Sequence, residues 1–277
     1  MKNENMIVNP QPSTRRLRIG VFDSGLGGLT VVRALLEQIK GADFFYVADT
    51  AHAPYGEKSP EEILSFSLAI ANYFVDCRRI DALVVACNTA TSAAITHLRE
   101  RFPNLIIVGT EPAVKPAVEM SKSGAVGVLA TPATLKGDKY QQLVDRLKSK
   151  KTVKLYEQAC PGLVEHIEAG TVESQSSRRM LESWLAPMRQ REVDTIVLGC
   201  THYPLAKETI ARIMQREVRF LEAGEAIARR LKTLLCDANL TCEQGLNSLH
   251  LLVTGSIDKE AIKRIVPDYD TLSRLSF

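Results

Sequence analysis

Two cysteines stand where chemistry is expected, because each follows directly on an apolar run. Asp81–Ala90 reads DALVVACNTA and carries Cys87, and Asp194–Tyr203 reads DTIVLGCTHY and carries Cys200. In both stretches an Asp precedes the cysteine by six positions, and hydrogen-bonding residues follow it. One such stretch is explained by a core strand with an inert thiol at its end. Two matching stretches favour a functional pair.

A pair of thiols can serve the two faces of one carbon atom. One thiolate removes a proton and the opposite thiol returns one, which inverts the configuration without turning the substrate over. We expect a helix to begin after each cysteine and to lower the thiol pKa from its usual value near 8.5. His202 is placed to polarise Cys200, so a single Cys–His nucleophile for acyl transfer is the alternative.

The stretch Phe22–Gly28, FDSGLGG, follows an apolar run and opens a helical pattern. Its glycines would let backbone N–H groups approach a ligand, and a helix N-terminus favours an anion. The G-x-G-G spacing is not the dinucleotide fingerprint, and the chain has no G-x-x-x-x-G-K-[ST] phosphate loop. A tight strand-to-helix turn without a ligand is the alternative.

A polar stretch, Asp49–Lys58 (DTAHAPYGEK), is longer than the usual connection after a strand. We interpret it as a loop that covers substrate, with a plain connection as the alternative. Further along, Glu165 and Glu168 lie on a short helical pattern after Cys160. A solvated helix face is the ordinary role of such glutamates.

The remaining thiols and imidazoles show no comparable constellation. The chain has no CxxC pair and no secretory apolar segment, so neither a disulfide framework nor a structural zinc site is expected. We expect small buried apolar residues at Cys77, Cys236 and Cys242, and structural histidines at His97, His166 and His250.

Short apolar runs alternate with helical patterns, which is typical of parallel sheets covered by helices on both faces. The predicted strands are Leu17–Phe22, Asp43–Ala48, Ala82–Ala86, Leu105–Val108, Ala125–Ala130, Thr152–Tyr156, Thr195–Leu198, Val218–Leu221 and Leu251–Thr254. Ser59, followed by Pro60 and two glutamates, predicts a helix that begins with a capping box.

The chain also matches itself at a long offset. Arg18–Ser24 (RIGVFDS) matches Ala125–Thr131 (AVGVLAT), and the two cysteine stretches match at nearly the same offset. The alternative is that all parallel strands look alike. We predict an α/β fold of two similar parallel-sheet lobes related by pseudo-symmetry. Because ligands of open α/β sheets bind beyond the carboxyl ends of strands, we expect the active site in the cleft between the lobes.

Composition limits the class of protein. The chain has 277 residues, 45% hydrophobic and 24% charged, with a net charge of +3. These values are ordinary for a globular protein and provide no strong basic footprint for nucleic acid. No apolar run approaches the ~20 residues of a membrane helix. Residues 1–16 are polar and lack a signal-peptide core, so we expect a flexible leader and a cytoplasmic protein.

Six motifs, in order along the chain, together resemble the glutamate racemase family. They are FDSGLGGLTV, ADTAHAPYGEKS, VVACNTATSAA, TEPAVKPA, LATPATLK and LGCTHYPL. The resemblance implies a racemase that needs no cofactor or metal and supplies D-glutamate for peptidoglycan. It implies a first lobe of residues 17–112 plus 223–277 and a second lobe of residues 113–222, with the active site between them.

The resemblance also implies roles for single residues. Cys87 would take the α-proton from D-glutamate with help from Asp23, and Cys200 would take it from L-glutamate with help from His202. Glu168 matches the acidic helper on the Cys200 side. The positions that match substrate-holding residues are Asp23, Ser24, Tyr55, Gly56, Asn88, Thr89, Thr201 and His202, with Thr131 and Thr134 for a substrate carboxylate.

The implied partners are L- or D-glutamate and a second copy of the chain. The polar leader resembles that of family members activated by UDP-N-acetylmuramoyl-alanine. One departure is Glu222-Ala223, where members often carry Asp-Ser, and we interpret it as a packing variant that leaves the chemistry intact.

Three alternatives to glutamate racemisation remain open. The first is a racemase for aspartate or another amino acid, which a substrate panel separates. The second is a hydrolase or transferase built on Cys200 and His202, which predicts that Cys87→Ala keeps substantial activity. The third is a non-catalytic anion-binding module, although binding alone needs no paired thiols.

Overall fold

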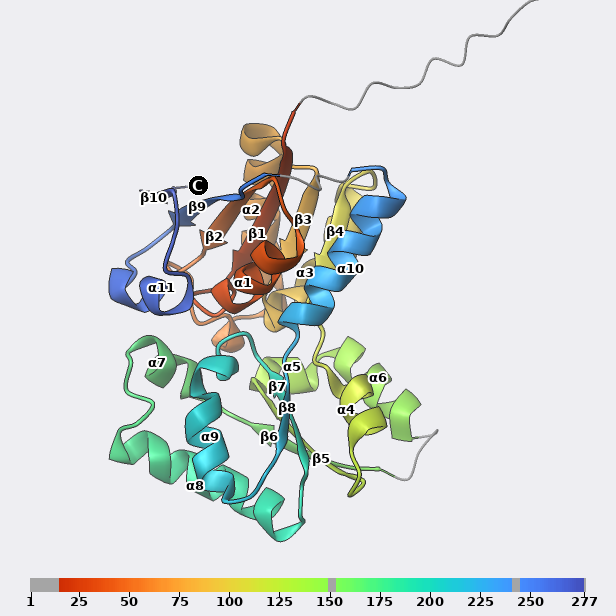
Figure 1. Cartoon of the computed structure of the whole chain (residues 1–277), viewed down its shortest axis with the longest axis vertical. Coiled ribbons are helices and arrows are strands. Elements are labelled where there is room, and N and C mark those ends of the chain that lie inside the picture. The colour runs from red at the N-terminus through yellow and green to blue at the C-terminus, as the bar shows by residue number, and fades with distance from the viewer. Residues whose placement is uncertain (1–14, 149–152, 241–244, 277) are drawn as a thin grey trace, which may run out of the picture.

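The protein is represented by a computed structural model, and the residues that the structure describes are 15–148, 153–240 and 245–276. Two sheets divide these residues into two lobes (Figure 1). The first sheet contains β1 (Leu17–Asp23), β2 (Ala42–Ala48), β3 (Ala82–Val85), β4 (Ile106–Gly109), β9 (Ser248–Val253) and β10 (Thr271–Arg274). The second contains β5 (Ala125–Ala130), β6 (Lys154–Ala159), β7 (Thr195–Gly199) and β8 (Arg219–Leu221).

The second sheet repeats the order of four neighbouring strands of the first. The first runs β10-β9-β2-β1-β3-β4 and the second runs β6-β5-β7-β8. Every strand pair in the described residues is parallel. The order β2-β1-β3-β4 therefore recurs as β6-β5-β7-β8, with β3 and β7, the strands before the two cysteines, in equivalent places. This recurrence confirms the predicted α/β fold of two pseudo-symmetric lobes.

Helices cover both faces of each sheet (Figure 1). In the first lobe α1 (Leu29–Gln38), α10 (Gly224–Asp237) and α11 (Lys259–Ile265) cover one face, and α2 (Pro60–Tyr73) and α3 (Asn88–Arg101) cover the other. In the second lobe α7 (Leu163–Glu168), α8 (Gln175–Gln190) and α9 (Lys207–Met214) cover one face, and α4 (Val114–Met120) and α6 (Asp138–Lys148) the other.

Shorter elements complete the chain. They are α5 (Pro132–Lys136), the 3-10 helices η1 (Tyr55–Glu57) and η3 (Tyr203–Ala206), and the π-helix η2 (Phe74–Arg78). Both α5 and η1 lie between the lobes, where they contact each other. No helix in the described part of the chain is long and apolar enough to cross a membrane.

The strands that carry the cysteines are apolar on both faces because both faces are covered. Along β3, Leu83 and Val85 pack into the core with α2 and α3, whereas Val84 packs into the core with α1. Side chains alternate along a strand, so Cys87 continues the Leu83–Val85 side. By the same alternation Cys200 continues the side of β7 that faces α8 and α9. The alternation of side chains along each strand therefore determines which core each cysteine faces.

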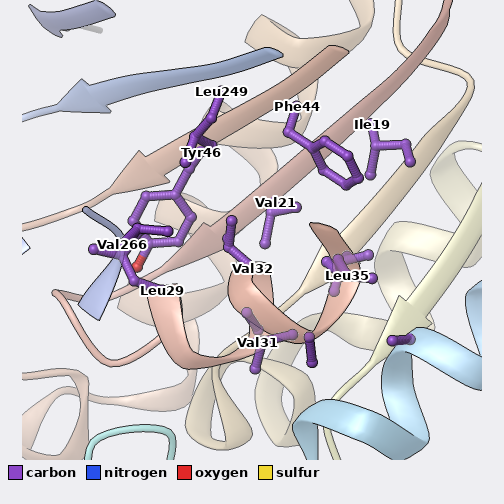
Figure 2. Close-up of a cluster of buried hydrophobic side chains, with 14 of the residues drawn as sticks. Ile19, Val21, Leu29, Val31, Val32, Leu35, Phe44, Tyr46, Leu249 and Val266 are labelled. Carbon is purple, nitrogen blue, oxygen red and sulfur yellow. The ribbon is translucent and has the colours of Figure 1, made fainter. Parts of the chain in front are cut away.

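Figure 2 shows the core between the first sheet and α1. Ile19 and Val21 of β1 and Phe44 of β2 face Val32 and Leu35 of α1 there, and each of these side chains is fully buried. This packing fixes α1 against the sheet, and with it the turn of residues 24–28 that precedes the helix.

The predicted strands are recovered with shifted ends, and one strand was missed. β6 begins and ends later than predicted, β9 begins three residues earlier, and β10 was not predicted. Thr152, the predicted start of β6, and residues 1–14 of the predicted leader lie outside the described residues. The predicted helix start at Ser59 is confirmed: its side chain accepts from Glu62 N, and Glu62 closes a capping box.

Candidate active site

The two paired cysteines lie in one cavity between the lobes. Cys87 and Cys200 are both buried, with 6% and 8% of each residue exposed. The cavity encloses about 600 Å³ of empty space, part of which is open to solvent. Its walls come from residues that follow β1, β2 and β3 in the first lobe and β5, β6 and β7 in the second.

Cys87 caps the N-terminus of α3, where the amide of Ala90 donates to its Sγ at 3.4 Å. The prediction that this helix start lowers the thiol pKa is wrong for Cys87. Burial, followed by the negative charge of Asp23, raises the pKa of Cys87 well above its ordinary value and outweighs the amide. Cys87 therefore holds its proton in the ligand-free protein.

Cys200 has a different neighbour. A turn and η3 follow it, and α9 begins only at Lys207. His202 Nδ1 lies 3.8 Å from Cys200 Sγ, and His202 Nε2 lies 2.8 Å from Glu168 Oε1. The His202 imidazole thus lies within reach of both the Cys200 thiol and the Glu168 carboxylate.

The imidazole and the carboxylate form an ion pair. Burial lowers the pKa of His202, but its hydrogen bonds with Cys200 and Glu168 raise it more, to a net value well above the usual one. Burial raises the pKa of Glu168, but the hydrogen bond and charge of His202 lower it to a net value below the usual one. Both directions agree that His202 donates its Nε2–H to an ionised Glu168.

The turn between β1 and α1 directs three consecutive N–H groups at side chains of the protein. Leu26 N donates to Glu168 Oε1 at 3.1 Å, and Gly28 N donates to Asp23 Oδ2 at 2.7 Å. Between them Gly27 N faces His202 Nε2 at 3.1 Å, and it donates there only while that nitrogen carries no proton. The prediction that this turn offers its N–H groups to a ligand is wrong for Leu26 and Gly28, which donate to side chains of the protein.

Glycine is required in this turn by close approach and not by a special dihedral angle. A Cβ at position 25 would lie 2.0 Å from Glu168 Oε1, and one at position 27 would lie 2.4 Å from His202 Nδ1. Neither Gly25 nor Gly27 has a positive φ. The missing side chains leave the space that the second lobe's Glu168 and His202 occupy.

Hydroxyl groups join the lobes on both sides of the cavity. Thr201 Oγ1 donates to Asp23 Oδ2 at 3.3 Å, and Thr30 Oγ1 lies 3.1 Å from the carbonyl oxygen of Thr201. On the other side Thr89 Oγ1 and Thr131 Oγ1 lie 3.3 Å apart. Polar contacts between residues that follow the strands therefore join the two lobes around the cavity.

The stretch Asp49–Lys58 forms part of the first-lobe wall and carries η1. Tyr55 Oη donates to Asp49 Oδ2 at 2.6 Å, and Thr254 Oγ1 donates to Asp49 Oδ1 at 2.7 Å. Burial, then the charge of Asp49, raises the pKa of Tyr55, so its hydroxyl remains a donor. The buried Asp49 thus anchors this stretch. A Cβ at Gly56 would lie 3.7 Å from Thr131 Cβ, so the walls of the two lobes come close together here.

Most of the predicted site residues line this cavity. They are Asp23, Ser24, Tyr55, Gly56, Cys87, Asn88, Thr89, Thr131, Cys200, Thr201 and His202. Two do not: Glu168 stands behind His202, and Thr134 accepts a hydrogen bond from Thr131 Oγ1 at 2.9 Å. The structure therefore places both of these residues one contact away from the cavity.

Some lining residues were not predicted. Cys160 follows β6, just as the paired cysteines follow β3 and β7, and Val164 and Glu165 continue that wall. The strand before Cys160 was visible in the sequence, and that signal could have found it. The expectation of buried thiols is wrong for Cys77 and Cys236, which are exposed, and Cys242 lies outside the described residues.

Residues 19–231 match the family described as Asp/Glu/Hydantoin racemase. With the two-lobed fold, this match defines the chain as a racemase, an isomerase. A curated relative, the glutamate racemase of Sulfurovum sp. (strain NBC37-1), is 59% identical over 260 residues, covering 94% of this chain and 98% of the relative. The chain belongs to this racemase family and, within it, to the glutamate racemases.

Solved structures agree with this placement. A glutamate racemase from Bacillus anthracis matches with a TM-score of 0.82 and 28% identity, covering 94% of this chain and 98% of that one. The Escherichia coli glutamate racemase, solved in complex with L-glutamate and the activator UDP-MurNAc-ala, matches with a TM-score of 0.80 and 32% identity, covering 95% and 99%.

Proposed function

We propose that this protein interconverts L- and D-glutamate by proton transfer between two cysteines, without a cofactor. The observation that carries the proposal is the placement of Cys87 and Cys200 at equivalent strand ends of two similar lobes, in one cavity. The substrate follows from the curated relatives and from the neighbour solved with L-glutamate. The lobes are taken as residues 17–112 plus 223–277 and residues 113–222.

In the direction from L- to D-glutamate, the Cys200 thiolate takes the α-proton and the Cys87 thiol returns its own proton to the opposite face. The enzyme is left with a Cys200 thiol and a Cys87 thiolate. This second form is the one that accepts D-glutamate, so the reverse reaction or exchange with solvent restores the first. The raised pKa of Cys87 supports this order, since it keeps that thiol protonated before L-glutamate binds.

The helpers differ between the two sides. Asp23 lies beside Cys87, and His202 with Glu168 lies beside Cys200. An imidazolium next to Cys200 would stabilise its thiolate, whereas a carboxylate next to Cys87 favours the thiol. We propose that the two forms of the enzyme are set by these unlike neighbours.

Two buried oxygen atoms support a position for the substrate ammonium group. Asp23 Oδ1 and Asn88 Oδ1 have no hydrogen-bond partner among the described residues, although both side chains line the cavity. A buried acceptor without a donor is costly. An α-ammonium group carries three donors and one positive charge, so we propose that it binds against these two oxygens.

The far wall of the cavity suits a substrate carboxylate. Thr131 presents a hydroxyl there, with Thr134 behind it, and η1 lies opposite. We propose that Tyr55, Gly56 and Thr131 hold the side-chain carboxylate. Ser24, Thr89 and Thr201 would then surround the α-carboxylate, where fixed dipoles stabilise carbanion character at the α-carbon.

We further propose, from the family resemblance, that the D-glutamate serves peptidoglycan synthesis in the cytoplasm. A homodimer and activation by UDP-N-acetylmuramoyl-alanine are proposals of the same origin. The E. coli neighbour supports the second of these, because it was solved with that activator. Static light scattering tests the dimer, and an assay with and without the nucleotide tests the activation.

The test of the reaction is incubation with L-glutamate in D2O under reducing conditions, with the α-proton signal and the optical rotation followed together. We expect both to decay in the wild type. Cys87→Ala and Cys200→Ala should each lose racemisation by about 10²–10⁴-fold. Substantial activity in Cys87→Ala would favour a single Cys200–His202 nucleophile instead. No decay with L-glutamate, with the activator added or with L-aspartate would overturn the racemase proposal.

A further inference from the structure

We propose that Tyr46 is a positioning residue for the Cys200 side of the reaction, acting from the opposite lobe through the Gly25–Leu26 peptide. The inference rests on the proposed function, because it concerns how the helpers of Cys200 are held. Tyr46 belongs to β2, does not line the cavity and is 1% exposed.

The link begins under the turn before α1. Tyr46 Oη donates to the carbonyl oxygen of Gly25 at 2.6 Å. Figure 2 shows the Tyr46 ring extending from β2 toward the start of α1, near Leu29. A Cβ at Gly28 would lie 2.8 Å from the Tyr46 hydroxyl, so the hydroxyl fits closely beneath the turn.

A planar peptide transmits this contact to the other lobe. In a trans peptide the C=O and the following N–H point in opposite directions, and the Gly25–Leu26 bond is not among the cis bonds of the described chain. Tyr46 holds the oxygen of that peptide, and Leu26 N donates to Glu168 Oε1 at 3.1 Å on the other side. The direction of the N–H is therefore fixed by the hydroxyl beneath the turn.

Glu168 connects the Leu26 N–H, through His202, to the Cys200 thiol. Its Oε1 also accepts from His202 Nε2 at 2.8 Å, and His202 Nδ1 lies 3.8 Å from Cys200 Sγ. The row Tyr46, peptide 25–26, Glu168, His202, Cys200 thus crosses from the first lobe to the second. Cys87 has no place in this row, so a loss at Tyr46 should act unequally on the two proton transfers.

The rival interpretation is that Tyr46 only fills the core. A buried tyrosine hydroxyl needs a partner wherever it lies, so a merely structural role predicts that Tyr46→Phe changes stability alone. Tyr140→Phe is the matched control, because it removes a buried hydroxyl that donates to Glu157 Oε1 at 2.5 Å in the second lobe, away from the turn.

The kinetic test uses α-deuterated L- and D-glutamate with both variants. Because the enantiomers have equal free energy, kcat/KM must fall equally in both directions, and we expect about a tenfold to hundredfold fall in Tyr46→Phe. The isotope effect on kcat/KM should rise for L-glutamate, whose proton goes to Cys200, and fall for D-glutamate. In Glu168→Gln, adding Tyr46→Phe should cost little more, because both act through one contact.

The second test needs no turnover. Amide hydrogen exchange of Leu26, followed by NMR in the ligand-free protein, should be at least about tenfold faster in Tyr46→Phe than in the wild type or Tyr140→Phe. Unchanged Leu26 exchange, or isotope effects that move together for both enantiomers, would overturn the proposal. A wild type that does not racemise glutamate would sink the proposed function, while the Leu26 exchange would still decide the role of Tyr46.

Discussion

At the scale of single residues, the two thiols are not equivalent although their strands are. Cys87 has a carboxylate for a neighbour and an amide at its Sγ, whereas Cys200 has an imidazole that is itself paired with Glu168. A symmetric pair of thiols would have no preferred protonation form. In the proposed two-thiol reaction, these unlike neighbours would give the two cysteines different roles.

The closeness of His202 to the turn leads to a prediction for Gly27→Ala. The new Cβ would lie 2.4 Å from His202 Nδ1, so the ring must shift, and its contact with Cys200 must change. We expect kcat/KM to fall by about 100-fold, the typical cost of displacing a catalytic group by about 1 Å. Steady-state racemisation assays with L- and D-glutamate measure the change.

Gly224→Ala is the control for that variant. Its Cβ would meet Ala34 Cβ at 3.4 Å, an ordinary contact at the start of α10. We expect it to keep the activity of the wild type. Equal activity in Gly27→Ala and Gly224→Ala would mean that the position of His202 does not matter for turnover.

At the scale of elements, the central strands were predicted more closely than two of the edge strands, β6 and β10. β3 and β7 are buried on both faces and appear in the sequence as unbroken apolar runs. β6 and β10 lie at sheet edges, where LYEQA and TLSR mix polar and apolar residues. An apolar run ends where an edge strand turns polar, so the predicted β6 ended too early and β10 was missed.

The residues of the cavity could be predicted to the extent that they follow strands. Asp23, Cys87 and Cys200 stand directly at strand ends, and their motifs carry them. Tyr46 bonds to Gly25 within the first lobe, and Thr30 contacts Thr201 of the second lobe. Their sequence neighbours are ordinary for a core strand and a helix. No local pattern marks such a residue, because its partner is distant in the chain.

The capping box of α2 yields a prediction for Ser59→Ala. The variant loses the bond from Glu62 N to Ser59 Oγ at 3.2 Å but keeps the backbone N–H of residue 59 that donates to Glu62. We expect the free energy of unfolding to fall by about 1 kcal/mol, as measured by urea denaturation. Racemisation per folded molecule should stay unchanged, since Ser59 does not line the cavity; a large fall in kcat would show coupling of α2 to the site.

At the scale of the whole molecule, the repeated Asp before each cysteine has a structural role in both lobes. Asp81 Oδ2 accepts from Arg18 N at 2.8 Å, and Asp194 Oδ2 accepts from Lys122 N and Ser123 N at 2.8 Å each. Each Asp therefore ties the start of a cysteine strand to the chain that enters the neighbouring central strand, β1 or β5. The repeated motif therefore contains a structural hydrogen-bonding Asp as well as a cysteine.

Asp194 provides a prediction for stability against pH. Partial burial raises the pKa of Asp194, but hydrogen bonds from Ser121, Ser123 and Lys122 lower it further, to a net value of about 2. The unfolded value is near 3.9. The unfolded chain binds this proton more readily, so the stabilisation is fully present above about pH 4–5 and is lost as the pH falls toward 2.

Asp194→Ala should therefore lower the free energy of unfolding by about 2–3 kcal/mol at pH 7 and flatten its dependence on pH between about 2 and 4. Urea denaturation across this range, with Glu217→Ala as an exposed carboxylate control, measures both effects. If the free energy of unfolding of Asp194→Ala falls at low pH as steeply as that of the wild type, other carboxylates are responsible for the acid sensitivity.

The strand order of the first lobe has a consequence for how the chain is made. β9 pairs with β2 in a register that joins Ser248 to Asp43, whereas β5 to β8 are contiguous in the chain. During synthesis the second lobe can therefore fold before β9 has emerged to pair with the edge of β2. An unpaired parallel edge invites association with other chains, so the nascent protein is exposed to aggregation until residues 248–253 have emerged from the ribosome.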